Sequence, residues 1–436
     1  MQMLSPLDGR YRGKIGALST FFSEEALNKY RLEVEIKYFI ALSKEAGIKQ
    51  LPRVSVKQEK ALLSVLKKYD DKEAAAIKKI ESVTNHDVKA VEYYLKKKLE
   101  KISGLKKYTE FVHFGLTSED VNNLSYGMMV NSALTEEIIP GALTYVSDIK
   151  KIAVANRTVK MLSLTHGQPA TASTMGKEMM VFVDRLNRQI DQMKAFSMQG
   201  KFGGAVGNYS AHKAAYPKFK WEAFGSKFIK SLGLDPMANT TQINPHDDIA
   251  EISHILFRFN TISIDLSRDI WSYISRGIFK QKVVKGEVGS STMPHKVNPI
   301  DFENGEGNMG LSNALFSHFA EKLPISRMQR DLSDSTVQRS IGSAFGYHAI
   351  AIAALRKGLG KLILNKKVVQ QELDDHPELL AEAVQTVLRK HGVKGAYEKM
   401  KELTRGETVT KKDFADFVKK IDIPDADKKH LLKIIG

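Results

Sequence analysis

The sequence predicts an all-α protein built from long helices, and three observations point to that fold class. Prolines are few, 12 in 436 residues, and the long intervals between them leave room for uninterrupted helices. No segment alternates apolar and polar residues over more than a few positions, as a strand would. Between Pro245 and Pro294, apolar residues recur at steps of three and four, the spacing of one helix face. This stripe consists of Ile252, Ile255, Leu256, Phe259, Ile262, Leu266 and Ile270.

The predicted helices divide into three helical domains. A chain of 436 residues exceeds the roughly 250–300 residues at which one core usually splits. We place an N-terminal helical domain at residues 1–110, a central long-helix domain at 111–364, and a C-terminal helical domain, rich in Lys and Glu, at 365–436.

Two further helices are expected in the central domain, at residues 302–323 and 336–364. The second has small residues that allow close helix packing, namely Ala344, Gly346, Ala349, Ala351, Ala353 and Ala354. Helices of this length cannot each bury a whole face inside one small domain. We therefore expect a bundle that extends across subunits.

Composition excludes several classes of protein. No window approaches about 18 consecutive apolar residues, so we expect no membrane span. The first residues, Met1 to Arg12, lack the apolar core of a signal peptide. The chain has no cysteine, which excludes disulfides, thiolate nucleophiles and cysteine-based zinc sites and is compatible with a reducing cytoplasm.

The net charge of +16 allows three interpretations. Nucleic-acid binding is one. The lysines, however, lie in helical polar stripes such as 96–107 rather than in a tail or beside RNA-binding aromatic residues. We therefore favour a solvated basic surface and expect no nucleic-acid partner. The third interpretation is that part of the charge serves anionic small substrates.

Several common motifs are incomplete. The glycines of 203–208 follow no predicted strand and lack the spacing of a dinucleotide fingerprint. The pair Gly176-Lys177 lacks the other residues of a P-loop, and the 12 histidines form no convincing set of metal ligands. We expect no cofactor and no metal, which leaves acid–base chemistry on a helical scaffold.

The segment 286–308, GEVGSSTMPHKVNPIDFENGEGN, is the candidate catalytic region. Its glycines, hydroxyl residues and Pro294 disfavour a helix, so 286–299 should form a loop between two long helices. An ordinary interhelical turn whose Ser and Asn residues cap the next helix is the alternative explanation.

This loop resembles the hallmark loop of the fumarase/aspartase superfamily, whose pattern is GSSxMPxKxNP. Within that superfamily the chain resembles the adenylosuccinate lyase family in its longer bacterial form, from Ser5 to at least Arg405. The other segments that carry the resemblance are SPLDGRY (5–11), TNHDVKAVEYYL (84–95), HFGLTSEDVNN (113–123), THGQPAT (165–171), GAVGNYSAH (204–212), TTQINPHD (240–247) and RDLSDSTVQR (330–339). Relatives usually continue for a short tail past the position of Gly436. We expect that this tail is truncated or disordered here.

The resemblance implies anti elimination of fumarate from two succinyl nucleotides, adenylosuccinate and succinyl-aminoimidazole carboxamide ribotide. Such a reaction needs a base for a weakly acidic Cβ proton and an acid for the departing nitrogen. The resemblance assigns the base to Ser290, with Ser291 as the fallback, and the stabilisation of the developing carbanion to Lys296 and Asn298. An alkoxide at Ser290 requires oriented amides and nearby positive charge.

The resemblance also assigns the general acid to His166, because an imidazole with a pKa near ~6.5 can protonate nitrogen around neutral pH. His86 is expected to orient His166 or a substrate group. Without the resemblance, His166 would pass for a histidine at a helix start before Pro169, and Asn85, His86 and Asp87 for a helix N-cap cluster.

The remaining predicted residues bind substrate. Thr117 and Ser118 resemble a hydroxyl pair for a succinyl carboxylate, although Ser118 before Glu119 and Asp120 also fits a capping box. Gln242 is expected at the succinyl or nucleotide end. Arginines suit phosphate through paired hydrogen bonds. The expected phosphate and ribose residues are Arg10, Tyr11, Arg330, Ser335 and Arg339, and Asn304 completes the predicted set with Asn85, Asp87, Ser291 and Asn298.

Members of the family assemble as homotetramers whose active sites combine residues of three subunits, which implies the same assembly here. Three rival functions remain. One is another fumarate-releasing lyase of the superfamily, one is a basic nucleic-acid-binding protein, and one is a relative that has lost activity.

Overall fold

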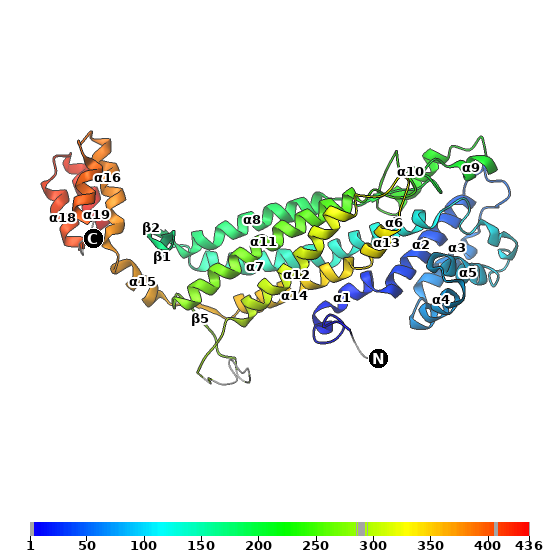
Figure 1. The fold of residues 1–436 in the computed structure, drawn as a ribbon, viewed down its shortest axis with the longest axis horizontal. Coiled ribbons are helices and arrows are strands. Elements are labelled where there is room, and N and C mark those ends of the chain that lie inside the picture. The colour runs from blue at the N-terminus through cyan, green and yellow to red at the C-terminus, as the bar shows by residue number, and fades with distance from the viewer. Residues whose placement is uncertain (1–3, 285, 287–292, 294, 405–408, 436) are drawn as a thin grey trace. The chain divides into compact units, whose positions relative to one another are not determined.

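We analysed a computed structural model, which describes residues 4–284, 286, 293, 295–404 and 409–435. Helices dominate the described residues, so the predicted all-α class is confirmed (Figure 1). The chain forms two compact units. Unit 1 comprises residues 1–145, 186–265 and 303–355, and unit 2 comprises 146–185, 266–302 and 356–436. The prediction of three domains remains a prediction.

Five long helices contribute residues to both units. They are α7 (Ile139–Ala155), α8 (Met175–Ala195), α11 (Asp247–Ser275), α12 (Ile300–Lys322) and α14 (Ile341–Leu359). Every residue of the predicted apolar stripe is buried in α11, so the helix and its inward face are confirmed. The helix predicted at 302–323 is α12. The region predicted as one helix at 336–364 is instead divided, because α14 ends at Leu359 and residues 362–364 form a strand.

The other elements of unit 1 are short and medium helices with one minimal strand pair. They are α1 (Arg12–Phe22), α2 (Glu24–Ser43), α3 (Val56–Lys67), α4 (Asp71–Thr84), α5 (Asp87–Leu99), η1 (Lys106–Phe111), α6 (Ser118–Ala133), the π-helical η2 (Leu134–Ile138), β3 (Gln199–Gly200), α9 (Ser210–Ala215), α10 (Trp221–Ser231), β4 (Asp235–Pro236) and α13 (Ser333–Gln338). Helix α2 packs against α5 and α6.

An aromatic core holds the segment 199–231 in unit 1. The Tyr38 ring of α2 meets the rings of Phe202, Phe224 and Phe228 at centroid distances of 5.5–6.1 Å. The Tyr38 hydroxyl donates to the Phe114 carbonyl oxygen at 2.6 Å. This bond ties the core to the loop that leads into α6.

The remaining elements of unit 2 are two strand pairs and a series of C-terminal helices. They are β1 (Lys160–Thr165), β2 (Gln168–Thr174), β5 (Phe279–Gln281), β6 (Leu362–Leu364), α15 (Lys366–Asp374), η3 (Pro377–Leu379), α16 (Leu380–Lys390), α17 (Ala396–Thr404), α18 (Lys411–Lys420) and α19 (Asp425–Ile435). The last four helices enclose an apolar core around Leu388, Phe414, Val418 and Leu431.

Residues 160–174 form an antiparallel hairpin that the sequence analysis did not anticipate. Its strands pair from Lys160 opposite Thr174 to Thr165 opposite Gln168, with an irregularity between Leu162 and Leu164. The interpretation of His166 as a residue at a helix start is therefore wrong. His166 and Gly167 form the two-residue turn of the hairpin, and both have positive φ, 53° and 73°. Two positive φ angles match the turn type that suits the twist of a hairpin.

Candidate active site

The predicted site residues are distributed over both units. Unit 1 holds most of the predicted substrate-binding residues together with His86, whereas unit 2 holds His166, Lys296 and Asn298. Ser290 and Ser291 lie outside the described residues. Within unit 1 the structure brings the predicted residues into three groups, each tied to a helix end.

The first group surrounds the start of α5. His86 is the N-cap, and its Nδ1 accepts a hydrogen bond from the Lys89 amide at 3.2 Å. Asn85 ends α4 in a left-handed conformation with φ of 51°. A capping cluster, the alternative that the sequence left open, is thus present, and capping leaves the exposed His86 ring free to have a second role.

Asp87 connects two arginines in this group. Its Oδ2 lies 2.7 Å from Nη2 of the buried Arg31 and 3.1 Å from Nη2 of the exposed Arg339. Burial raises the pKa of Asp87, but Arg31, the Val88 amide and Arg339 together outweigh it and hold the pKa below its usual range. Asp87 is therefore an anion that positions Arg339, the residue predicted to grip phosphate.

The second group is the N-terminus of α6, which carries Thr117 and Ser118. Thr117 is the N-cap, one residue before the predicted start of the capping box, and its amide donates to Asp120 Oδ2 at 2.9 Å. Asp120 also accepts from the amides of Gly203 and Gly204, each at 2.9 Å. Lys201 Nζ lies 2.7 Å from Asp120 Oδ1 and donates to the Gly204 carbonyl oxygen at 2.7 Å.

Both charged side chains of this pair are completely buried. A buried ion pair needs further hydrogen bonds to offset its desolvation, and here Asp120 accepts from three backbone amides while Lys201 also donates to a carbonyl oxygen. The Asp120–Lys201 pair therefore fixes the Thr117-Ser118 turn against the glycine-rich segment 203–208. The glycines are required there for geometry: Gly204 and Gly207 have φ of 78° and 76°.

The third group surrounds Arg330, which lies between α12 and α13. Its Nη1 donates to Gln242 Oε1 at 3.2 Å, and Gln242 Nε2 donates to the Ala205 carbonyl oxygen at 2.9 Å. Its Nη2 lies 3.4 Å from Glu119 Oε2 and 3.7 Å from Asp334 Oδ1. Two predicted substrate residues, Arg330 and Gln242, thus meet beside two carboxylates.

Glu119 has the unusual electrostatics of this group. Its side chain is 3% exposed. Burial raises its pKa to about 7, with Asp334 contributing in the same direction, although His246, Arg330 and Lys201 act the other way. Asp334 itself has a lowered pKa: burial opposes the shift, but the His246 ring, whose Nε2 lies 3.5 Å from Asp334 Oδ2, and the charge of Arg330 prevail.

Glu119, His246 and Asp334 each offer a ligand atom within 4.8 Å of the others. We do not assign a metal to this group, because the Arg330 guanidinium already supplies the positive charge beside both carboxylates. In addition, His246 Nε2 lies 2.8 Å from Gln338 Nε2. A hydrogen bond to that amide uses the lone pair that a metal would need.

Three further predicted residues of unit 1, Arg10, Tyr11 and Asn304, lie outside these groups, and two of them are linked. The side chain of Asn304, on α12, donates from Nδ2 to the Tyr11 hydroxyl at 3.5 Å. Arg10 is exposed. Ser335 lies in the first turn of α13, where its amide donates to Asp334 Oδ1 at 2.6 Å.

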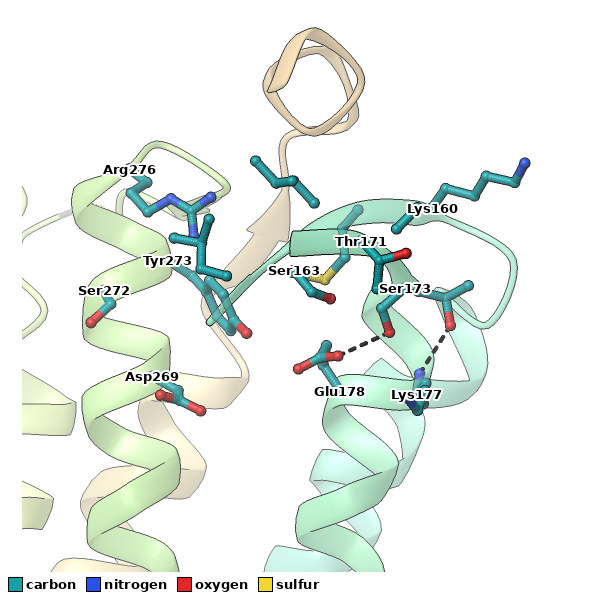
Figure 2. Close-up of a pocket in the computed structure, with 15 residues that line it drawn as sticks. Lys160, Ser163, Thr171, Ser173, Lys177, Glu178, Asp269, Ser272, Tyr273 and Arg276 are labelled. Atoms are coloured by element: carbon teal, nitrogen blue, oxygen red, sulfur yellow. Dashed lines mark hydrogen bonds between the residues drawn. The ribbon is translucent and has the colours of Figure 1, made fainter. Parts of the chain in front are cut away.

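In unit 2, His166 is exposed at the hairpin turn, and Lys296 is exposed in the irregular segment before α12. A cavity of about 750 Å³ lies under the hairpin (Figure 2). Ser173, Glu178, Tyr273 and Arg276 are among its lining residues, but His166 is not. The Ser173 hydroxyl donates to Glu178 Oε1 at 2.9 Å, and Arg276 lies 2.8 Å from Glu372. Because the lining mixes both signs of charge, the cavity has no evident preference for an anion.

Several buried charged residues of unit 1 were missed by the sequence analysis. They are Arg31, Glu35, Glu119, Asp120, Lys201, His246 and Asp334. Glu35 pairs with His113, whose Nδ1 lies 2.5 Å from Glu35 Oε1. Burial opposes the protonation of His113, yet Glu35 outweighs it and raises the pKa of the ring. Only Glu119 and Asp120 had a local signal, because they directly follow the predicted Thr117-Ser118 pair.

Comparison with known proteins covers nearly the whole chain. A family model described as lyase matches residues 9–314, and one described as adenylosuccinate lyase C-terminal matches residues 326–435. The adenylosuccinate lyase of Legionella pneumophila (strain Corby) is 51% identical over 434 residues, which are 100% of this chain and 95% of the relative. That of Escherichia coli (strain K12) is 49% identical over 428 residues, 98% of this chain and 94% of the relative.

Solved structures share the fold at low identity. A fumarate lyase from Mesorhizobium sp. BNC1 has a TM-score of 0.76 at 14% identity and covers 96% of this chain and 93% of its own. The 3-carboxy-cis,cis-muconate lactonizing enzyme from Pseudomonas putida has a TM-score of 0.75 at 18% identity, with coverages of 97% and 92%. Among the described residues, no helix combines the length and apolar character that a membrane crossing requires. The family match over 9–314 and the full-length similarity to curated relatives together establish that the chain belongs to the adenylosuccinate lyase family.

Proposed function

We propose that this enzyme cleaves adenylosuccinate to AMP and fumarate, and that it performs the same elimination on succinyl-aminoimidazole carboxamide ribotide. The observation that carries the proposal is the identity of about half of all residues, over the full chain, with relatives named adenylosuccinate lyase. The arginines and amide donors of unit 1 support it, because both substrates bring carboxylates and a phosphate.

The proposed chemistry is an elimination that needs no external oxidant or reductant. Ser290, or Ser291 in its place, removes the Cβ proton of the succinyl group, and Lys296 and Asn298 stabilise the carboxylate next to the carbanion. The electron pair of the broken C–H bond forms the double bond of fumarate, and the C–N bond breaks with its pair on nitrogen. His166 then gives a proton to that nitrogen. General acid catalysis of this kind contributes about 10²–10⁴-fold.

Substrate binding is assigned to unit 1 residues whose positions are stabilised by buried groups. Thr117 and Ser118 donate to a succinyl carboxylate from a turn anchored by Asp120 and Lys201. Arg339, beside Asp87, binds phosphate together with Ser335, Arg10 and Tyr11. Asn85 and Asn304 contribute further polar contacts, and Gln242 acts beside Arg330. In this proposal His86 orients either His166 or the substrate.

We further propose a homotetramer in the cytoplasm. Exposed apolar side chains on the long helices support assembly: Leu143, Phe257 and Leu311 in unit 1 are 41%, 37% and 52% exposed, and Val154 in unit 2 is 56% exposed. Burying such side chains against another subunit would be favourable. The absence of cysteine is compatible with a reducing compartment. Light scattering should give four times the 48.8 kDa chain mass, and a monomer with full activity would contradict the assembly.

The function is tested by adding adenylosuccinate to the purified protein and measuring AMP and fumarate. We expect equal amounts of both. His166→Asn should lower kcat by about 10²-fold or more while the oligomer persists. Asparagine is the better replacement because, like histidine, it tolerates positive φ, so the turn is preserved. Ser290→Ala should lower kcat at least as far.

Two outcomes would contradict the proposal. If the folded oligomer leaves both succinyl nucleotides intact, it is an inactive relative or acts on another substrate, which argininosuccinate, aspartate and malate would reveal. If both variants lose the oligomer, His166 and Ser290 are structural. Steeply salt-dependent binding of duplex DNA that is indifferent to both substitutions would instead favour the nucleic-acid alternative.

A further inference from the structure

Arg330, whose side chain is 14% exposed, makes few hydrogen bonds. A guanidinium has five N–H donors, and among the described residues one hydrogen bond is made, from Nη1 to Gln242. The Nε atom is buried without a partner. The carboxylates of Glu119 and Asp334 lie 3.4 and 3.7 Å from Nη2, farther than the ~2.7–2.9 Å of a strong charge-assisted hydrogen bond. Arg330 therefore retains the capacity to bind a further anion.

Among the carboxylates near Arg330, Glu119 also has an incomplete set of hydrogen-bond partners. It lies in the first turn of α6, and its Oε1 is buried without a partner among the described residues. The charged and titratable groups that face it are Arg330, His246 just before α11, Asp334 of α13 and Lys201 after β3. Lys201 is already bound to Asp120 and to the Gly204 carbonyl oxygen. Two carboxylates thus share one available guanidinium.

We propose that Glu119 is a proton-linked positioning residue: when an anionic group of the substrate binds Arg330, Glu119 releases the guanidinium and takes up a proton from solvent. This inference rests on the proposed function. It concerns a residue to which that function assigns no role, because Glu119 acts through Arg330 rather than on the reacting atoms. The anionic group is the phosphate or a carboxylate of the succinyl nucleotide.

The electrostatics of the site support this exchange. Burial raises the pKa of Glu119 to about 7, so both of its protonation states are populated at neutral pH. An anion placed on Arg330 would raise that pKa further, since a second negative charge disfavours the ionised form. Conversely, an ionised Glu119 competes with the substrate for Arg330. Substrate affinity should consequently fall as pH rises above 7.

Kinetics across pH 6–9 test the competition. In the wild type, the competition between Glu119 and the substrate should raise KM for adenylosuccinate by up to about tenfold per pH unit above 7. It should leave kcat at saturating substrate unchanged. Glu119→Gln should remove this component of the rise in KM. Glu119→Asp should restore it, which a merely structural role would not predict. Glu137→Gln, the loss of an exposed carboxylate in the η2 segment, is the matched control and should behave as wild type.

Calorimetry gives a second test that requires no variant. Binding of AMP, or of fumarate, to the wild-type enzyme at pH 7.5 in buffers of different ionisation enthalpy reports the protons exchanged. Uptake of up to about one proton is expected for the product that occupies Arg330. Uptake with AMP identifies the phosphate, and uptake with fumarate identifies a carboxylate. When a phosphate binds a cation, the phosphate itself releases protons. Proton uptake by Glu119 has the opposite sign and can therefore be distinguished from that release.

The outcomes separate this inference from the proposed function. An enzyme that cleaves adenylosuccinate but shows the same pH dependence of KM in wild type and Glu119→Gln overturns the role of Glu119. Cleavage by a wild type that takes up no proton on binding either product also overturns the role of Glu119. This second test remains valid if the Glu119→Gln variant fails to fold. A wild type without cleavage instead overturns the proposed function.

Discussion

Two consecutive carboxylates at the start of α6 have opposite surroundings. Asp120 accepts from Lys201 and from the amides of Thr117, Gly203 and Gly204. Glu119, buried to a similar degree, faces Arg330 at 3.4 Å and has one oxygen without a partner among the described residues. A buried charge whose partners are complete stabilises a structure, whereas an incomplete set costs stability. The comparison indicates that Asp120 serves the fold and Glu119 serves the site.

The largest expected effect comes from breaking the complete pair. Asp120→Asn leaves Lys201 buried without a counter-ion and should lower the free energy of unfolding by about 3–5 kcal/mol, measured by urea denaturation. The double variant Asp120→Asn/Lys201→Met should recover part of the loss, because it removes both charges. A loss below about 1 kcal/mol in the single variant would mean that the pair is not structural.

The second effect is the pH dependence that Glu119 gives to the free energy of unfolding. The folded pKa of Glu119 is about 7 against an ordinary value of 4.5, so between these values the folded state holds a proton that the unfolded state has lost. The free energy of unfolding therefore falls as pH rises from 4.5 to 7, by up to about 3 kcal/mol from this group. Glu119→Gln lacks this term and should gain stability relative to wild type between pH 5 and pH 8, as measured by chemical unfolding. A difference that is constant with pH would refute the assignment.

A third, smaller effect concerns Asp87, which is intermediate between the two cases. Asp87→Asn weakens its bonds to Arg31 and Arg339, but Arg31 keeps Asn122 and Asn28 as acceptors at 2.8 and 3.1 Å. We expect a loss of about 1–2 kcal/mol near neutral pH, measured by urea denaturation. Because the folded pKa of Asp87 is depressed, the wild-type advantage should disappear as pH falls through that pKa. Persistence of the full difference in strong acid would contradict this explanation.

The smallest effect belongs to a surface pair. Lys78 and Glu24 lie 2.5 Å apart, but their side chains are 54% and 51% exposed. Solvent and salt screen such pairs, so Glu24→Gln should change the free energy of unfolding by less than about 1 kcal/mol. The same urea titration, repeated at high salt, should bring even this difference close to zero. If Glu24→Gln lowered the free energy of unfolding as much as Asp120→Asn, burial and the number of hydrogen-bond partners would not determine how much a charged residue contributes to stability.

The sequence predicted the long helices better than the hairpin. The stripe from Ile252 to Ile270 repeats over five turns of α11, so one error in it would not change the interpretation. Residues 160–174 are short, and most of β2 is exposed or half-buried, so there is little hydrophobic alternation to read. The turn signal was His166-Gly167, which resembles the Asn-Gly pair of hairpins, but without the family resemblance His166 was interpreted as a residue at a helix start before Pro169.

The site residues next to helix starts could also be predicted from the sequence. The contacts between site residues that are far apart in the sequence could not. Thr117, Ser118 and the 85–87 trio adjoin helix starts, where capping patterns are recognisable within four residues. The grouping of Glu119, His246 and Arg330 depends on tertiary folding that brings three distant segments together. No spacing rule predicts such a meeting, and the capping pattern gave no reason to expect Glu119 to be buried.

The adjacency of Glu119 and Asp120 restricts which lengths the preceding loop can have. Successive residues of an α-helix differ in direction by about 100°, so the two carboxylates leave the first turn of α6 toward different partners. If one residue inserted between His113 and Ser118 shifted the register of the helix start, Glu119 would take the place of Asp120 beside Lys201, and Asp120 would turn away from both Lys201 and Arg330. The longer glutamate would then be forced into the site that fits aspartate. Among natural variants of this chain, substitutions in this loop should therefore be common compared with changes in its length.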